Sequence, residues 1–126
     1  MTQPVYILGG YQTDFAKTWA RNGQDISDMV KETTEGTLEN CQLDASAIQS
    51  IHVGNAFAEL QRQQAHLGSM VAQMTPALWG IPAMRHEGAC ASSSLGVLSE
   101  LYLQSRNKLS PKPTLSVAFK NLAGMI

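Results

Sequence analysis

The sequence predicts an α/β fold in which a mostly parallel sheet is covered by helices. Short apolar runs rich in β-branched residues alternate with segments whose apolar residues recur every three or four positions, as in strand–helix–strand crossovers. No repeat, low-complexity tract or internal linker interrupts this alternation. The chain has 126 residues, 44% of them hydrophobic and 15% charged, which suffices for one modest core. We therefore expect a single domain over residues 1–126.

Four short segments are predicted to be strands. Each is apolar and is followed by glycine, asparagine or a change to helical spacing, and they cover residues 4–10, 51–55, 83–87 and 114–119. The first is closed by Gly9 and Gly10 and suits a strand buried on both faces. A dinucleotide-binding loop after this strand is disfavoured, because the G-x-G-x-x-G spacing is missing.

Three main helices are predicted between these strands, over residues 26–41, 61–74 and 91–104, with a shorter helical turn at 43–48. Asp25 is the expected N-cap of the first helix. Its predicted inner face follows steps of three and four residues and consists of Ile26, Met29, Val30, Thr33, Thr37 and Cys41. In the second helix, Met70 and Met74 are expected to be packing residues.

Composition excludes several classes of function. Nine basic residues against ten acidic ones give a net charge of -1 with no basic run, which disfavours a nucleic-acid partner. No apolar stretch approaches the ~20 residues of a membrane span, so we expect a soluble, cytoplasmic protein. Cys41 and Cys90 have no second cysteine nearby and are expected to be free thiols. His52, His66 and His86 lack ligand-like spacing, so no metal site is predicted.

Cys90 lies where the third predicted strand gives way to a helix. A thiol attacks carbonyl carbon as the thiolate, and the amino end of a helix favours negative charge through its dipole and unpaired amide groups. We expect the amides near Ala91 to point toward the Cys90 side chain. Small neighbours, such as Gly88 and Ala89, leave room for a thioester to approach. Taken alone, a cysteine in such a position could equally be a small buried packing residue.

Three segments in order carry a family resemblance. Residues 87–96, Glu-Gly-Ala-Cys-Ala-Ser-Ser-Ser-Leu-Gly, resemble the nucleophile segment of thiolases, and residues 5–10 and 53–57 extend the likeness. The resemblance implies a layered thiolase-like fold of which this chain is the amino-terminal part. It also implies that Cys90 is the catalytic nucleophile, forming a covalent thioester with the acyl group of an acyl-CoA. The family then passes that group to a thiol or to an acetyl-CoA carbanion, making or cleaving a carbon–carbon bond.

The same resemblance implies that coenzyme A thioesters are substrates and that no cofactor is permanently bound. It implies a homodimer in which the strand before the nucleophile lies near the two-fold interface. An open sheet edge and apolar helix faces also favour association, either as that dimer or with a partner chain supplying the missing half. A ketoacyl-synthase-like condensing enzyme and a noncatalytic interaction subunit remain as alternatives.

The sequence departs from the thiolase pattern in several places. It has neither the Gly-His-Pro nor the Cys-x-Gly motif of the family, so we expect the isolated chain to be weak or inactive. His86 is expected to be structural or at the surface, and Cys41 to be a packed apolar thiol. Ser93 replaces the usual glycine, and residues 119–122 lack the family's small and acidic residues. A fragment of an acyltransferase, a piece of a split enzyme and a truncated binding module all remain open.

Overall fold

A three-stranded parallel sheet lies at the centre of the protein. The computed structural model describes residues 4–106 and 115–118. The central strand β1 (Ile51–Gly54) pairs on one side with β2 (Ala83–His86) and on the other with β3 (Leu115–Ala118). The predicted strands at 51–55, 83–87 and 114–119 are therefore confirmed within these bounds, although Phe119 lies outside the described residues. The α/β class with a parallel sheet is also confirmed.

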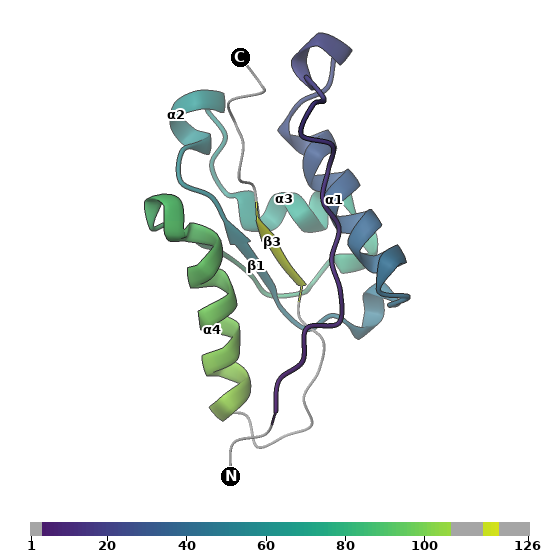
Figure 1. The fold of residues 1–126 in the computed structure, drawn as a ribbon, viewed down its shortest axis with the longest axis vertical. Helices are drawn as coiled ribbons and strands as arrows, with labels where there is room; N and C mark the ends of the chain where they lie inside the picture. Colours follow the sequence, from purple (N-terminus) through teal and green to yellow (C-terminus); the bar gives the residue numbers. More distant parts are fainter. Residues whose placement is uncertain (1–3, 107–114, 119–126) are drawn as a thin grey trace.

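Helices cover both faces of this sheet. α4 (Ser92–Arg106) packs on one face, and α3 (Leu67–Met74) packs on the other, with α1 (Ile26–Asn40) against α3 (Figure 1). A shorter helix, α2 (Ala58–Arg62), follows β1, and 3-10 turns connect the larger elements at η1 (Ala20–Asn22), η2 (Ala45–Ala47), η3 (Pro76–Leu78) and η4 (Ala89–Ala91). Right-handed crossovers between parallel strands lead to this layered arrangement.

The main core lies between the sheet and the α1–α3 layer. All four residues of β1 are buried, as expected of a central parallel strand with helices on both sides. The apolar core residues are Trp19, Ile26, Met29, Val30, Ile48, Ile51, Val53, Ala58, Leu67, Met70, Val71 and Leu78. By contrast, α4 leaves much of its apolar surface exposed, including Leu98 and Tyr102. No helix among the described residues is long and apolar enough to cross a membrane.

The first helix begins where the sequence predicts. The Asp25 carboxylate accepts a hydrogen bond from the Ser27 amide at 2.7 Å, and the Asp28 carboxylate accepts one from the Asp25 amide at 2.9 Å. This capping box satisfies amides that have no partner inside the helix. Thr34 rather than Thr33 belongs to the buried face, and the Thr33 hydroxyl instead donates to the Met29 carbonyl at 2.7 Å.

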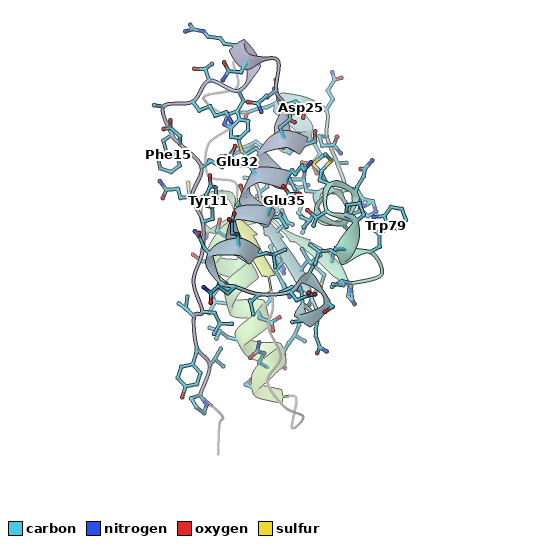
Figure 2. All side chains as sticks on the ribbon, turned by 90° about the vertical axis from the view of Figure 1, so that its right-hand side faces the viewer. Tyr11, Phe15, Asp25, Glu32, Glu35 and Trp79 are labelled. Atoms are coloured by element: carbon cyan, nitrogen blue, oxygen red, sulfur yellow. The ribbon has the colours of Figure 1, made fainter. Side chains whose placement is uncertain are left out.

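The prediction of a buried strand at residues 4–10 is wrong. This segment has no strand structure, and Ile7 is 94% exposed. Only the carboxyl end of the segment reaches α1, where the Asn40 side-chain amide donates to the Gly10 carbonyl at 3.1 Å. Tyr11 donates its hydroxyl hydrogen to Glu32 at 3.0 Å, so the residue after the segment is fixed on the same helix (Figure 2). An apolar β-branched run becomes a strand only where a neighbouring strand pairs with it, and here the described sheet gives it none.

The predicted helix over residues 61–74 is divided in the structure. α2 ends at Arg62 and α3 begins at Leu67, and the chain between them turns sharply. Gln63 and His66 both have positive φ angles, of 52° and 57°. These backbone conformations cannot continue an α-helix. The predicted buried residues Leu67, Met70 and Val71 are confirmed, whereas Ala65 is exposed.

Gly54 allows the end of β1 to touch the start of α4. A Cβ atom at this position would lie 2.5 Å from the Cα of Ser93 and 2.8 Å from the carbonyl carbon of Ser92. Both obstructing atoms belong to the backbone, so they cannot rotate away as a side chain would. Only glycine permits this strand and helix to approach so closely.

We predict that Gly54→Ala lowers the free energy of unfolding by about 1–3 kcal/mol, the usual cost of forcing extra volume into a packed interior. Urea unfolding followed by circular dichroism measures the change. Gly10→Ala is the matched control, because a Cβ there meets nothing within 4 Å, and it should alter stability by less than about 0.5 kcal/mol. Equal stability of the two variants would show that the β1–α4 contact relaxes without cost.

Candidate functional site

Cys90 lies at the edge of the sheet where parallel strands end. β2 ends at His86, and the chain passes through Glu87 and Gly88 into η4, whose middle residue is Cys90. α4 begins two residues later, at Ser92. Cys90 is a free, exposed cysteine, so it is not enclosed in an apolar interior. In parallel α/β sheets, the carboxyl edge of the strands is where ligands bind.

The turn that carries Cys90 has an unusual backbone. Ala89, the preceding residue, has a φ of 49°, a left-handed conformation that costs a non-glycine residue about 1 kcal/mol or more. Two side chains hold it there. Glu87 accepts a hydrogen bond from the Ala89 amide at 2.8 Å, and the Ser92 hydroxyl donates to the Ala89 carbonyl at 2.7 Å. The position of Cys90 is therefore fixed by contacts on both sides of it.

The amides next to Cys90 differ from the sequence expectation. The Ala91 amide donates to the Gly88 carbonyl at 2.9 Å, and the Ser92 amide donates to the Ala89 carbonyl. These two groups are used within the turn, so the expectation of unpaired amides near Ala91 is wrong. What remains at this end of α4 is the dipole of a 15-residue helix, which favours negative charge near its first turn.

A pair of histidines, one of them fully buried, lies on the α4 face of the sheet. His52 on β1 is fully buried, and its Nδ1 lies 2.9 Å from Nε2 of His86 on β2. The two rings are stacked, with centroids 5.1 Å apart. The other nitrogen of His52, Nε2, lies 3.0 Å from a carboxylate oxygen of Glu100 on α4, at an angle outside that of a well-formed hydrogen bond. Three elements thus meet in one polar cluster.

Burial dominates the acid–base behaviour of His52. It lowers the pKa of His52 below the ordinary value of 6.5, because removal from water penalises the charged form, and nearby His86 acts in the same direction. The Glu100 carboxylate opposes this shift but does not cancel it. His52 is therefore neutral in the folded protein at neutral pH.

A second polar group fixes the loop after β1. Arg85 donates from Nε and Nη2 to the Asn55 carbonyl at 3.2 and 3.1 Å, and its Nη1 forms an ion pair with Glu59. Asn55 is buried and its side-chain oxygen accepts a hydrogen bond from the Ala58 amide at 2.9 Å, at the start of α2. The loop beside the carboxyl ends of β1 and β2 is thus anchored at both ends.

The remaining residues singled out from the sequence do not join Cys90. Cys41 is half-buried at the C-cap of α1 and lies outside the core cluster, so the prediction of a packed thiol on the inner face of the helix is met only in part. His66 is exposed at the start of α3. In the part of the chain that the structure describes, no group of three potential ligands could hold a metal ion. Sequence reasoning missed the cluster of His52, His86 and Glu100, for which the only signal was a histidine inside an apolar strand.

An exposed thiol at a strand-to-helix turn, above a parallel sheet, places the protein in the class of α/β proteins with a candidate cysteine nucleophile. No protein-family model matches the chain. Two relatives named acetyl-CoA acetyltransferase, from Methanothermobacter thermautotrophicus and Methanocaldococcus jannaschii, are each 34% identical to it over 75% and 74% of its length. The non-specific lipid-transfer protein-like 2 of Caenorhabditis elegans is 36% identical over 84%.

The chain belongs to the thiolase superfamily, and it is a partial thiolase-like chain. It spans about a quarter of the length of these curated relatives. The matched part covers 24% of the Methanothermobacter protein, 25% of the Caenorhabditis protein and 23% of the Methanocaldococcus protein.

We predict that His52 makes the protein less stable in mild acid. Its pKa is lowered on folding, so below pH 6.5 the unfolded chain binds a proton that the folded protein resists, and stability falls as pH decreases. Urea unfolding at pH 7.5, 6.5 and 5.5 should show this decline, and His52→Gln should flatten it.

His66→Asn is the control for this measurement, because it removes an exposed histidine and asparagine tolerates the positive φ at that position. This variant should keep the full decline of stability below pH 6.5. A His52→Gln profile identical to that of the unaltered protein would contradict the assignment of the effect to His52.

Proposed function

We propose that this chain carries the nucleophile of a thiolase-type acyl transfer, with Cys90 as the residue that takes the acyl group from a coenzyme A thioester. The observation that carries the proposal is the exposed position of Cys90 in a constrained turn at the carboxyl edge of the sheet. The names of two relatives, both acetyl-CoA acetyltransferases, support the same type of reaction. Acetyl-CoA is accordingly the first substrate to test.

The chemistry requires a thiolate and a reachable thioester. The Cys90 sulfur attacks the carbonyl carbon of the thioester, a new carbon–sulfur bond forms, and coenzyme A leaves as its thiolate. The acyl group then passes to another thiol or to a carbanion of acetyl-CoA, and the latter transfer forms a carbon–carbon bond. Exposure of Cys90 supports the first step, because attack on a bulky thioester needs a thiol that is open to solvent.

The complete reaction needs groups that this sequence lacks. The Gly-His-Pro and Cys-x-Gly motifs of thiolases are missing from it, and the chain spans about a quarter of its relatives. We propose that the full activity belongs to an assembly in which further sequence or a partner chain supplies these groups, with a homodimer as the expected form and the cytoplasm as its location. In the chain alone, the reaction should stop at the acyl-enzyme.

We predict that incubation with acetyl-CoA adds one acetyl group to the protein and that Cys90→Ser abolishes the addition. Intact-mass spectrometry measures the product, and hydroxylamine should remove it, since a thioester is cleaved under conditions that leave an amide intact. Cys41→Ser is the matched control and should be acetylated like the unaltered protein, because Cys41 is half-buried at a helix end.

Acetyl addition that persists in Cys90→Ser would remove this cysteine from the proposed mechanism. A parallel incubation with an acyl-carrier-protein thioester tests the substrate class. Faster acylation from the carrier protein than from acetyl-CoA would point to a condensing enzyme of the ketoacyl-synthase type instead.

A further inference from the structure

Glu100, His52 and His86 lie in a row that runs from α4 across β1 to the end of β2, near the candidate site. We call it the histidine relay. The Glu100 carboxylate accepts hydrogen bonds from the Ser50 hydroxyl at 3.1 Å and from the Gln104 side-chain amide at 2.8 Å. These contacts hold the carboxylate on the inner side of α4, 3.0 Å from Nε2 of His52. The relay then continues from Nδ1 of His52 to Nε2 of His86.

The hydrogen-bonding chemistry of the three side chains determines which ring nitrogens of the histidines carry protons. An ionised carboxylate can only accept, so its proximity favours the proton of neutral His52 on Nε2. Nδ1 of His52 then carries a lone pair, and the neighbouring Nε2 of His86 must donate to it across 2.9 Å. A neutral His86 therefore has its proton on Nε2 and an unprotonated Nδ1. The relay thus leaves one nitrogen of His86 able to take up a proton.

The register of the sheet places His86 beside the start of α4. His86 is the last residue of β2 and lies opposite Gly54 at the end of β1. Register partners in neighbouring strands are about 5 Å apart. Gly54 in turn touches the backbone of Ser92 and Ser93, which come directly after the η4 turn that carries Cys90. His86 is therefore adjacent to the strand end against which the start of α4 is packed, and the Cys90 turn leads directly into that start.

His86 and the Cys90 turn are also joined through the backbone. The His86 carbonyl accepts a hydrogen bond from the Asn55 amide at 3.2 Å, which fixes the point where the chain leaves the sheet. Three residues then separate His86 from Cys90, and the turn within η4 shortens that path. His86 is only half-buried, in contrast to His52, so its free nitrogen is not enclosed by the core as His52 is.

We propose that the histidine relay makes His86 the proton acceptor for the thiol of Cys90. The sulfur–hydrogen bond of Cys90 breaks, its electron pair stays on sulfur, and one bridging water carries the proton by taking it from sulfur and giving one of its own to Nδ1 of His86. The positive charge then on His86 is balanced by Glu100, which acts through His52. His52 and Glu100 are positioning residues, and the proton returns to sulfur when the thiolate is released. This inference rests on the proposed function only for the identity of the group that the thiolate attacks, a coenzyme A thioester.

Alkylation of Cys90 by iodoacetamide tests the relay without any coenzyme A thioester. In a Cys41→Ser background, the rate should rise with pH, and His86→Gln should move the midpoint of this rise upward by about one pH unit, since a neighbouring charge or hydrogen bond shifts a titration by that order. Glu100→Gln should move it in the same direction by a smaller amount. His66→Asn, which removes a histidine outside the relay, should leave the profile unchanged.

Two further measurements separate a proton acceptor from a structural support. Urea unfolding identifies any variant that has lost its fold. If His86→Gln is such a variant, its alkylation profile cannot be used, and nitrogen NMR of the histidine rings in the unaltered protein tests the relay instead. The expected spectrum has an unprotonated Nδ1 on His86 at high pH, which gains its proton in the same pH range in which alkylation slows. A protonated Nδ1 on neutral His86, or identical alkylation profiles in folded His86→Gln and the unaltered protein, would overturn the relay.

The outcomes also distinguish this inference from the proposed function. Alkylation that depends on His86, together with no acetyl addition from acetyl-CoA, would support the relay and reject acyl transfer. Acetyl addition at Cys90, with alkylation independent of His86, would support acyl transfer and reject the relay.

Discussion

The close contact between the end of β1 and the start of α4 is the constraint on which the candidate site depends. At Gly54 the strand backbone meets the helix backbone with no side chain between them. This contact brings the first turn of α4 over the carboxyl edge of the sheet, where η4 and Cys90 lie. It also brings Glu100, two turns further along α4, to within 3.0 Å of His52. A bulkier residue at position 54 would therefore move the Cys90 turn away from the edge of the sheet and Glu100 away from His52.

The turn around Cys90 shows how side chains stabilise a backbone conformation that is unfavourable by itself. The energetic cost of the left-handed conformation of Ala89 is offset by its hydrogen bonds to the Glu87 carboxylate and the Ser92 hydroxyl. The same Ser92 hydroxyl also accepts a hydrogen bond from the Gly88 amide at 3.1 Å. Strained residues persist where their surroundings determine them fully, and they cluster at functional sites. Here the strain lies one residue before the thiol, so the local geometry and the chemistry proposed for Cys90 concern the same turn.

Sequence patterns were sufficient where the structure depends on neighbours in the chain. The Asp25 cap, the α1 helix and the strand-to-helix change before Cys90 all follow from local spacing and local hydrogen bonds. The segment 4–10 was predicted wrongly because pairing depends on a distant strand, and its apolar pattern is the same whether or not a partner is present. The break at Gln63 was missed because neither glycine nor proline marks it.

The histidine relay could not be predicted from spacing, since its members are separated by 34 residues between His52 and His86 and lie on three different elements. Its existence nevertheless has a physical consequence for the sheet. Without His86, Nδ1 of the buried His52 would lose its hydrogen-bond partner, at a cost of about 1–3 kcal/mol, and without Glu100 its Nε2 would lose the nearby carboxylate. The contacts that reduce this cost also join β1, β2 and α4, so the same polar groups hold together the three elements that surround Cys90. Loss of these polar contacts should therefore lower stability at the edge of the sheet where Cys90 lies.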